Sequence, residues 1–221
     1  MAPPAPGSDA YVAAYADCGV AVSRYVGGDW HDARLGIHVA LPDTSSWAAG
    51  GRAAVCTAYV FEDVSTGLAS GRSGPLLGAL AGRTNMTDLL DLQLHCVDVV
   101  SQPSSDGWYQ TLNGLSTGRC DQPHAGEYIG TVPVAGATRP TDDELATAMT
   151  AACRTKAAAF LGLGQVQFDQ RTDIRVTWPG LSNDQWQAGE HTQRCFALVP
   201  YASKVQTSLK GLGAGALPTL N

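Results

Sequence analysis

Two stretches of the chain repeat apolar residues at the spacing of an amphipathic α-helix. The apolar positions are Tyr11, Tyr15, Cys18, Val22 and Tyr25 in the first stretch, and Leu145, Met149, Ala152, Cys153, Ala157 and Phe160 in the second. Thr141 and Glu144 stand at the spacing of a capping box, the reciprocal pair of bonds that opens many helices. Gly27 and Gly162 follow the two stretches, and glycine is the residue that most often ends a helix. We therefore predict two helices that end at these glycines.

Shorter runs rich in apolar and β-favouring residues predict strands. They cover residues 52–61, 90–100, 107–112, 127–134 and 192–201. Residues 62–87 show no regular period, which predicts a connector with one short helix at 76–80. Together these elements predict an α+β fold in which each helix packs on a small, mainly antiparallel sheet.

The chain contains an internal repeat. The helix that carries Cys18 recurs 135 residues later, and in both copies a tryptophan then stands nine residues before a second cysteine. The matched pairs are Cys18 with Cys153, Tyr25 with Phe160, Gly27 with Gly162, Trp47 with Trp186, and Cys56 with Cys195. Such self-similarity is typical of two structural units of one design. We predict an abbreviated unit over residues 1–80 and a complete unit over 81–221.

The six cysteines predict disulfides, because they are even in number and include no C-x-x-C pair of the kind that binds zinc. If equivalent cysteines have equivalent partners, the repeat pairs Cys18 with Cys56 and Cys153 with Cys195, and Cys96 is left for Cys120. Three disulfides indicate an oxidising compartment. Six buried free thiols are the alternative, since cysteine is often buried.

Composition narrows the class of protein. Of 221 residues, 44% are hydrophobic, which is enough for a packed core and too many for disorder to be expected. Only 15% are charged, and the net charge is −6. The negative charge argues against nucleic acid or an anionic membrane surface as the main partner. No run reaches the roughly 18 apolar residues of a membrane span, so we expect none in this chain.

A set of short motifs carries a family resemblance. The motifs are Cys120-Asp-Gln-Pro-His124-Ala-Gly-Glu127, then Cys153, then Trp186-Gln-Ala-Gly189 followed by Cys195. In this order they resemble the actinobacterial septum-formation domain family. The resemblance covers the whole family pattern over residues 90–211. Residues 8–72 match only the back half of that pattern and lack the Pro-His-x-x-Glu element. It implies an extracytoplasmic envelope protein linked to cell division, anchored to the cytoplasmic membrane by a segment upstream, with no established reaction.

His124 and Glu127 are the foremost candidate pair for binding a ligand or partner. An imidazole and a carboxylate three residues apart can hold a ligand or metal, or exchange protons with a substrate. A structural role in the turn after Pro123 is the alternative, with the imidazole bonded to nearby backbone. No catalytic residue is singled out, because the chain shows no nucleophile elbow and no phosphate loop.

The tryptophans divide into two groups. Trp47 and Trp186 occupy equivalent positions, so we expect structural plugs that close the end of each sheet. Trp108 and Tyr109 lie in a glycine-rich region without a counterpart, as does Trp30. Because loops carry variable function on a fixed scaffold, Trp108 and Tyr109 are candidate surface contacts for a ligand or partner.

The sequence predicts a non-catalytic extracytoplasmic module that binds a protein or another component of the division or envelope machinery. We expect it to need no cofactor and no metal. Two alternatives remain, a small-ligand or metal-binding sensor and an envelope hydrolase, and both centre on His124 and Glu127.

Overall fold

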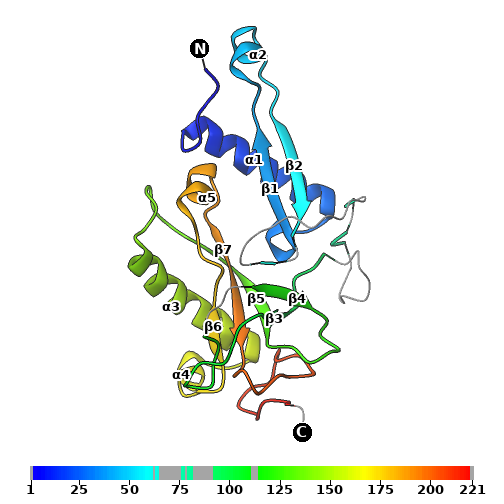
Figure 1. The fold of residues 1–221 in the computed structure, drawn as a ribbon, viewed down its shortest axis with the longest axis vertical. Coiled ribbons are helices and arrows are strands. Elements are labelled where there is room, and N and C mark those ends of the chain that lie inside the picture. The colour runs from blue at the N-terminus through cyan, green and yellow to red at the C-terminus, as the bar shows by residue number, and fades with distance from the viewer. Residues whose placement is uncertain are drawn as a thin grey trace.

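The computed structural model describes residues 2–61, 63–64, 76–77, 79–81, 92–110 and 114–219. The N-terminal half lies at one end of the long axis and the C-terminal half at the other (Figure 1). The fold combines helices with antiparallel sheets, as predicted. No helix in the described ranges has the length and hydropathy needed to cross a membrane.

The N-terminal half consists of one long helix packed on a β-hairpin. Its elements are α1 (Asp9–Val26), the short helix η1 (Trp30–Asp32), β1 (Leu35–Ala40), α2 (Thr44–Ala48) and β2 (Val55–Val60). The Ser8 side chain accepts a bond from the Tyr11 amide at the start of α1, and Gly27 ends the helix at a φ of 83°. β1 pairs with β2 in an antiparallel sheet of two strands, and α2 lies at the far tip of this hairpin (Figure 1).

The C-terminal half is built on an antiparallel sheet of five strands in the order β4-β3-β5-β7-β6. Its strands are β3 (Cys96–Val99), β4 (Leu115–Gly118), β5 (Gly126–Pro133), β6 (Arg175–Thr177) and β7 (Thr192–Leu198). Its helices are α3 (Asp142–Leu161), α4 (Gln165–Asp169) and α5 (Asn183–Ala188). The predicted capping box of Thr141 and Glu144 is present, and Gly162 ends α3 at a φ of 75°.

The same order of elements occurs in both halves. A long helix, a short helical turn, a strand, a short helix and a second strand follow one another as α1–η1–β1–α2–β2 and as α3–α4–β6–α5–β7. In each case the two strands pair antiparallel, and a disulfide joins the long helix to the second strand. The bonds are Cys18–Cys56, Cys153–Cys195 and, between β3 and the turn after β4, Cys96–Cys120, so the predicted pairing is confirmed.

Three apolar clusters form the interior. One lies between α3 and the larger sheet, and includes Met149, Phe168 and Trp186. A second lies between α1 and the hairpin, around Val22 and Leu35. The third covers the opposite face of the larger sheet and joins the two halves, because Phe61 and Val64 pack there with residues such as Phe196.

The strand predictions are confirmed in part. Segments 52–61, 192–201 and 90–100 contain β2, β7 and β3, and segment 127–134 covers all of β5 except its first residue. The prediction of a strand over 107–112 is wrong for residues 107–110, which contribute only an isolated bridge between Tyr109 and Pro103. β4 begins at Leu115 instead. The helix expected at 76–80 is not present in its described residues, where Leu77 and Ala79 lie in turns, and most of the connector lies outside the described residues.

Candidate functional site

His124 lies inside the C-terminal half and is fully buried. Its Nδ1 donates a hydrogen bond of 2.8 Å to the Gln122 carbonyl, and its Nε2 lies 3.4 Å from Oε1 of Glu127. The backbone of His124 exchanges two bonds with Val205, of 2.9 and 3.0 Å. The imidazole is therefore enclosed by the chain on the sides that its two nitrogens face.

Glu127 binds the segment that follows β7. One carboxylate oxygen accepts 2.6 Å from the Leu209 amide, and the other accepts 2.7 Å from the Ser208 hydroxyl. The side chain is buried, so these bonds replace the water that the charge has lost. The Pro-His-x-x-Glu motif thus fastens residues 205–209 to the start of β5.

The environment of His124 favours its charged form. Burial lowers its pKa, but the bonds to Glu127 and to the Gln122 carbonyl outweigh this, and the resulting pKa is above the usual 6.5. Because Nδ1 donates to a carbonyl, a neutral ring would turn a lone pair on Nε2 toward the carboxylate. In the protonated ring both nitrogens carry a hydrogen, so Nδ1 donates to the Gln122 carbonyl and Nε2 to the Glu127 carboxylate.

Removing the His124 imidazole is expected to change how stability depends on pH. A pKa that folding raises contributes stability that is complete below about pH 6.5 and is lost as the pH rises through the raised value. His124→Gln keeps a donor but cannot titrate. Relative to this variant, the melting temperature of the wild type should fall as the pH rises above about 6.5. Parallel profiles would contradict the assignment.

Cys96 Sγ, His124 and Glu127 form the one group of three candidate metal ligands found in the described ranges, with ligand atoms within 4.8 Å of one another. Cys96 is bonded to Cys120, and a disulfide sulfur does not offer the thiolate that metals bind. Both oxygens of Glu127 already accept protein donors. In the oxidised chain, the residues at this position therefore suit a structural role better than a metal centre.

Trp108 and Tyr109 lie against the larger sheet. Trp108 is 7% exposed, and the Arg175 guanidinium covers its ring at 4.2 Å. Tyr109 is half-buried and meets Tyr201 edge to face, with ring centroids 5.7 Å apart. Burial and the nearby Asp98 carboxylate raise the pKa of Tyr109 to about 12. Trp108 is thus an interior residue and not an exposed contact; a role of this pair in binding stays a prediction.

The two equivalent tryptophans have different surroundings. Trp186 is buried in the cluster under α3 and stacks on His191 at 3.8 Å. Trp47 is half-buried in α2 at the hairpin tip and belongs to none of the three clusters. The Arg52 guanidinium lies over its ring, with its central carbon 4.1 Å from the ring centroid. The expected plug is therefore absent at Trp47, because no sheet or helix of the described chain covers the tip of the hairpin.

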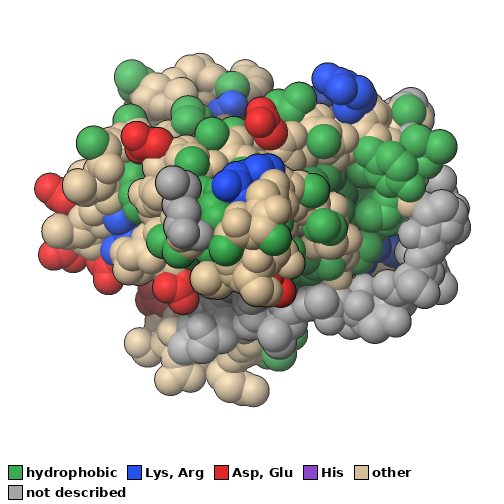
Figure 2. All heavy atoms as spheres, turned by 90° about the horizontal axis from the view of Figure 1, so that it is seen from above, with side chains coloured by type: hydrophobic (Ala, Val, Ile, Leu, Met, Phe, Trp, Pro, Cys, Tyr) green, Lys and Arg blue, Asp and Glu red, His purple; other side chains and the backbone are tan. Residues whose placement is uncertain are grey.

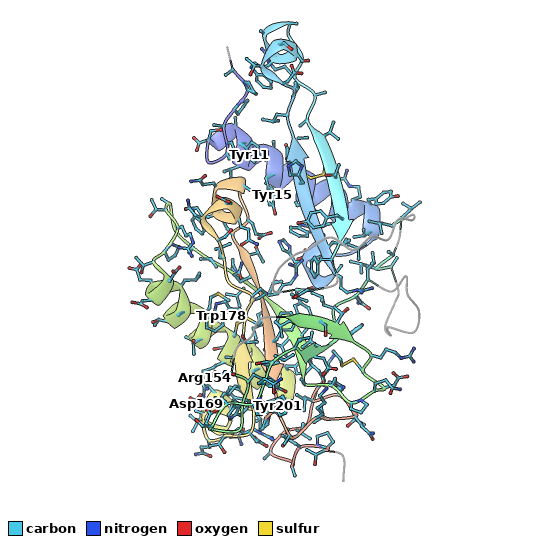
Figure 3. The ribbon with its side chains drawn as sticks, viewed as in Figure 1. Tyr11, Tyr15, Arg154, Asp169, Trp178 and Tyr201 are labelled. Atoms are coloured by element: carbon cyan, nitrogen blue, oxygen red, sulfur yellow. A yellow bond between two sulfur atoms is a disulfide. The ribbon has the colours of Figure 1, made fainter. Side chains whose placement is uncertain are left out.

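A groove of about 690 Å³ lies between the two halves. One wall is formed by Tyr15, Trp30, residues 35–37, Tyr59, Phe61 and Val64, and the other by residues 179–182, 184–185, 188, 190 and 192–194. Figure 3 shows Tyr15 on α1 beside α5. The approach is close at Gly189, where φ is 102° and a Cβ would stand 3.3 Å from Tyr15. Both conditions favour glycine there.

Polar contacts across the groove hold the halves together. Arg194 on β7 donates to the carbonyls of His31, Ala33 and Leu35 at 2.7, 3.3 and 3.0 Å. The Tyr15 hydroxyl donates 3.0 Å to the Glu190 carboxylate. Burial lowers the pKa of Arg194, while burial and Glu190 raise that of Tyr15.

Gln193 on β7 has a buried carbonyl oxygen that no donor meets in the described chain. The residue is 4% exposed, and its Oε1 has no hydrogen-bond partner within the described chain, while its Nε2 donates to the Thr192 carbonyl. A buried carbonyl without a donor is unfavourable, and such groups are rare in native proteins. The sequence analysis did not identify Arg194 or Gln193. Both stand just before Cys195 on β7, but nothing local indicates that Arg194 reaches the N-terminal half.

Comparison with known proteins gives one family. A family model described as "Septum formation" matches residues 1–195, and the match runs through both halves. No curated protein and no solved structure matches the chain.

Proposed function

Because the chain belongs to the septum-formation family, we propose that it is a non-catalytic module of the cell envelope that binds a component of the division or envelope machinery. We place it on the outer side of the cytoplasmic membrane, anchored there. Its three disulfides support this location, because such bonds persist in oxidising compartments.

The groove between the halves is the observation that carries the proposal. It combines apolar side chains such as Trp30 and Leu181 with polar ones such as Asp184, so it offers a partner both apolar area and hydrogen-bonding groups. The polar atoms of His124 and Glu127 instead form hydrogen bonds within the chain itself. The residues free to meet a partner therefore lie at the groove and not at the histidine.

A photo-crosslinking amino acid at Asp184 tests the proposal. Asp184 is exposed on α5 and lines the groove. We expect it to give a discrete crosslinked species in intact cells of the native source. The matched control is Val166, which is 73% exposed on α4 and lies outside the groove lining. Equal yields at the two positions, or none at Asp184, would contradict a binding role for the groove.

Gln193→Leu is expected to separate stability from binding. Leucine fills a similar volume and removes the unpaired acceptor, so the free energy of unfolding should rise by about 1 kcal/mol. The crosslink from Asp184 should keep its yield, because the buried carbonyl lies out of a partner's reach. Urea unfolding measures the first effect, and the yield of the crosslinked species measures the second. A variant that is less stable than the wild type would show that Oε1 has a partner in the free chain.

A further inference from the structure

Among the described residues, none pairs with the outer edge of β2. Val55–Val60 contains no charged residue, no proline and no glycine, and in the described ranges these residues pair only with β1. Edge strands are normally protected by charges, proline or bulges, because their free amides and carbonyls recruit other strands. This edge has none of those protections.

The direction of the free groups follows from the hairpin register. The Phe61 amide donates 3.0 Å to the Arg34 carbonyl, so Tyr59 and Thr57, at alternate positions, also face β1. The amides and carbonyls of Cys56, Ala58 and Val60 therefore point away from β1, toward the free edge. An antiparallel strand placed there would find donors and acceptors at regular spacing.

In the C-terminal half, β5 occupies the position that corresponds to the outer edge of β2. β7 follows its helix and short helix as β2 does, and its edge away from β6 is paired with β5. Gly130 of β5 stands opposite Cys195, which is fully buried. Cys56, at the matching place on β2, is exposed. The position of β5 beside β7 therefore indicates what kind of strand would fit beside β2.

The helix above this edge also lacks a cover. Lys156 of α3 lies over Gly130, 3.7 Å from the position of a Cβ, and the residue 135 positions earlier is Ala21 of α1, which is exposed. Beside it Val20 is 59% exposed, and Val55 on β2 is 57% exposed. Figure 2, seen from the hairpin end, shows hydrophobic side chains gathered on one side of this end of the molecule. The apolar surface suits a strand with apolar side chains.

We infer that the outer edge of β2 accepts an extended segment of a partner protein as an additional antiparallel strand, a mode of binding called β-augmentation. The inference rests on the proposed function and specifies the chemistry of the partner. By analogy with β5, the segment is uncharged at its centre, alternates apolar side chains toward α1, and carries a small residue opposite Cys56. A second copy of β2 fits less well, because Val55–Val60 contains no glycine for that position.

Hydrogen exchange with a synthetic peptide of the β5 sequence tests the inference. The amides of Cys56, Ala58 and Val60 exchange freely in the unbound chain if they face solvent. At saturating peptide we expect their exchange to slow about tenfold or more, while the amides of Thr57 and Tyr59 change little. The same peptide methylated at its alternate, strand-facing amides is the matched control, and it should give no protection.

A variant tests the edge from the side of the protein. Ala58→Pro removes one outward amide and leaves the bonds to β1 in place, which is the position where strands tolerate proline. It should abolish protection of Cys56 and Val60, while the Cys18–Cys56 bond and the melting temperature stay close to those of the wild type. If this variant does not fold, the methylated peptide still decides the result.

Absence of protection at saturating peptide would overturn the inference, as would equal protection by the methylated peptide. Protection that rises with protein concentration and needs no peptide would assign the edge to a second copy, and would also overturn it. If the groove crosslinks through Asp184 while β2 stays unprotected, the proposed function stands and only this inference fails.

Discussion

Replacing Cys153 and Cys195 together by alanine should lower the free energy of unfolding by about 4 kcal/mol. The disulfide closes a loop with a sequence separation of 42, and the chain-entropy model assigns about this value to such a loop. Both residues are fully buried between α3 and the sheet, so packing adds to the loss. For a chain of this size, the melting temperature should fall by about 8–16 °C. A fall below about 2 °C would contradict the stabilising role.

The Cys18–Cys56 bond provides the comparison. It closes a loop of similar length, but Cys56 is exposed on β2. Under graded reduction, Cys18–Cys56 should open first and Cys153–Cys195 last, because thiolate attack requires access to a sulfur. Alkylation followed by peptide mapping gives the order. The reverse order would show that β2 is covered in solution.

Replacing Arg194 by methionine should lower the free energy of unfolding by about 3–5 kcal/mol. The guanidinium serves three backbone carbonyls of the N-terminal half, and methionine fills a similar space without a donor. The carbonyls would then remain buried and unsatisfied, which costs about 1–3 kcal/mol each before relaxation. Equilibrium unfolding in urea measures the total.

Two matched variants separate this contact from charge in general. Arg119→Met removes an arginine whose ion pair with Asp121 is exposed, so the free energy of unfolding should change by no more than about 0.5 kcal/mol. Arg194→Lys keeps the charge but replaces a planar fork by a single ammonium, and should fall between wild type and Arg194→Met. Equal effects of Arg119→Met and Arg194→Met would refute the role assigned to the carbonyl contacts.

These contacts matter for function because both halves form the groove. Arg194 and Glu190 belong to its walls and also hold the N-terminal half in place. Loss of Arg194 is therefore expected to weaken binding at the groove as well as stability.

Elements with local signals are the ones that could be predicted from the sequence. The capping box at Thr141, the glycines at 27 and 162 and the helical spacing of apolar residues act within a few turns of chain, and all appear as predicted. The repeat also determined the disulfide pairing, because equivalent cysteines have equivalent partners. The weakest local signals lay at 107–112, where the structure places no strand in the described residues and starts β4 at Leu115.

Only the tertiary structure decided which side chains face one another across the halves. The burial of Trp108 depends on Arg175, and the fastening of the C-terminal segment depends on Glu127 meeting Ser208 and Leu209. Arg194 finds its carbonyl partners about 160 positions earlier in the chain. Contacts between residues so far apart in the sequence form only when two surfaces pack together. The spacing of residues within either surface does not predict them. For the same reason, the sequence did not indicate the open edge of β2. Comparison with β7, which pairs with strands on both edges, identifies it.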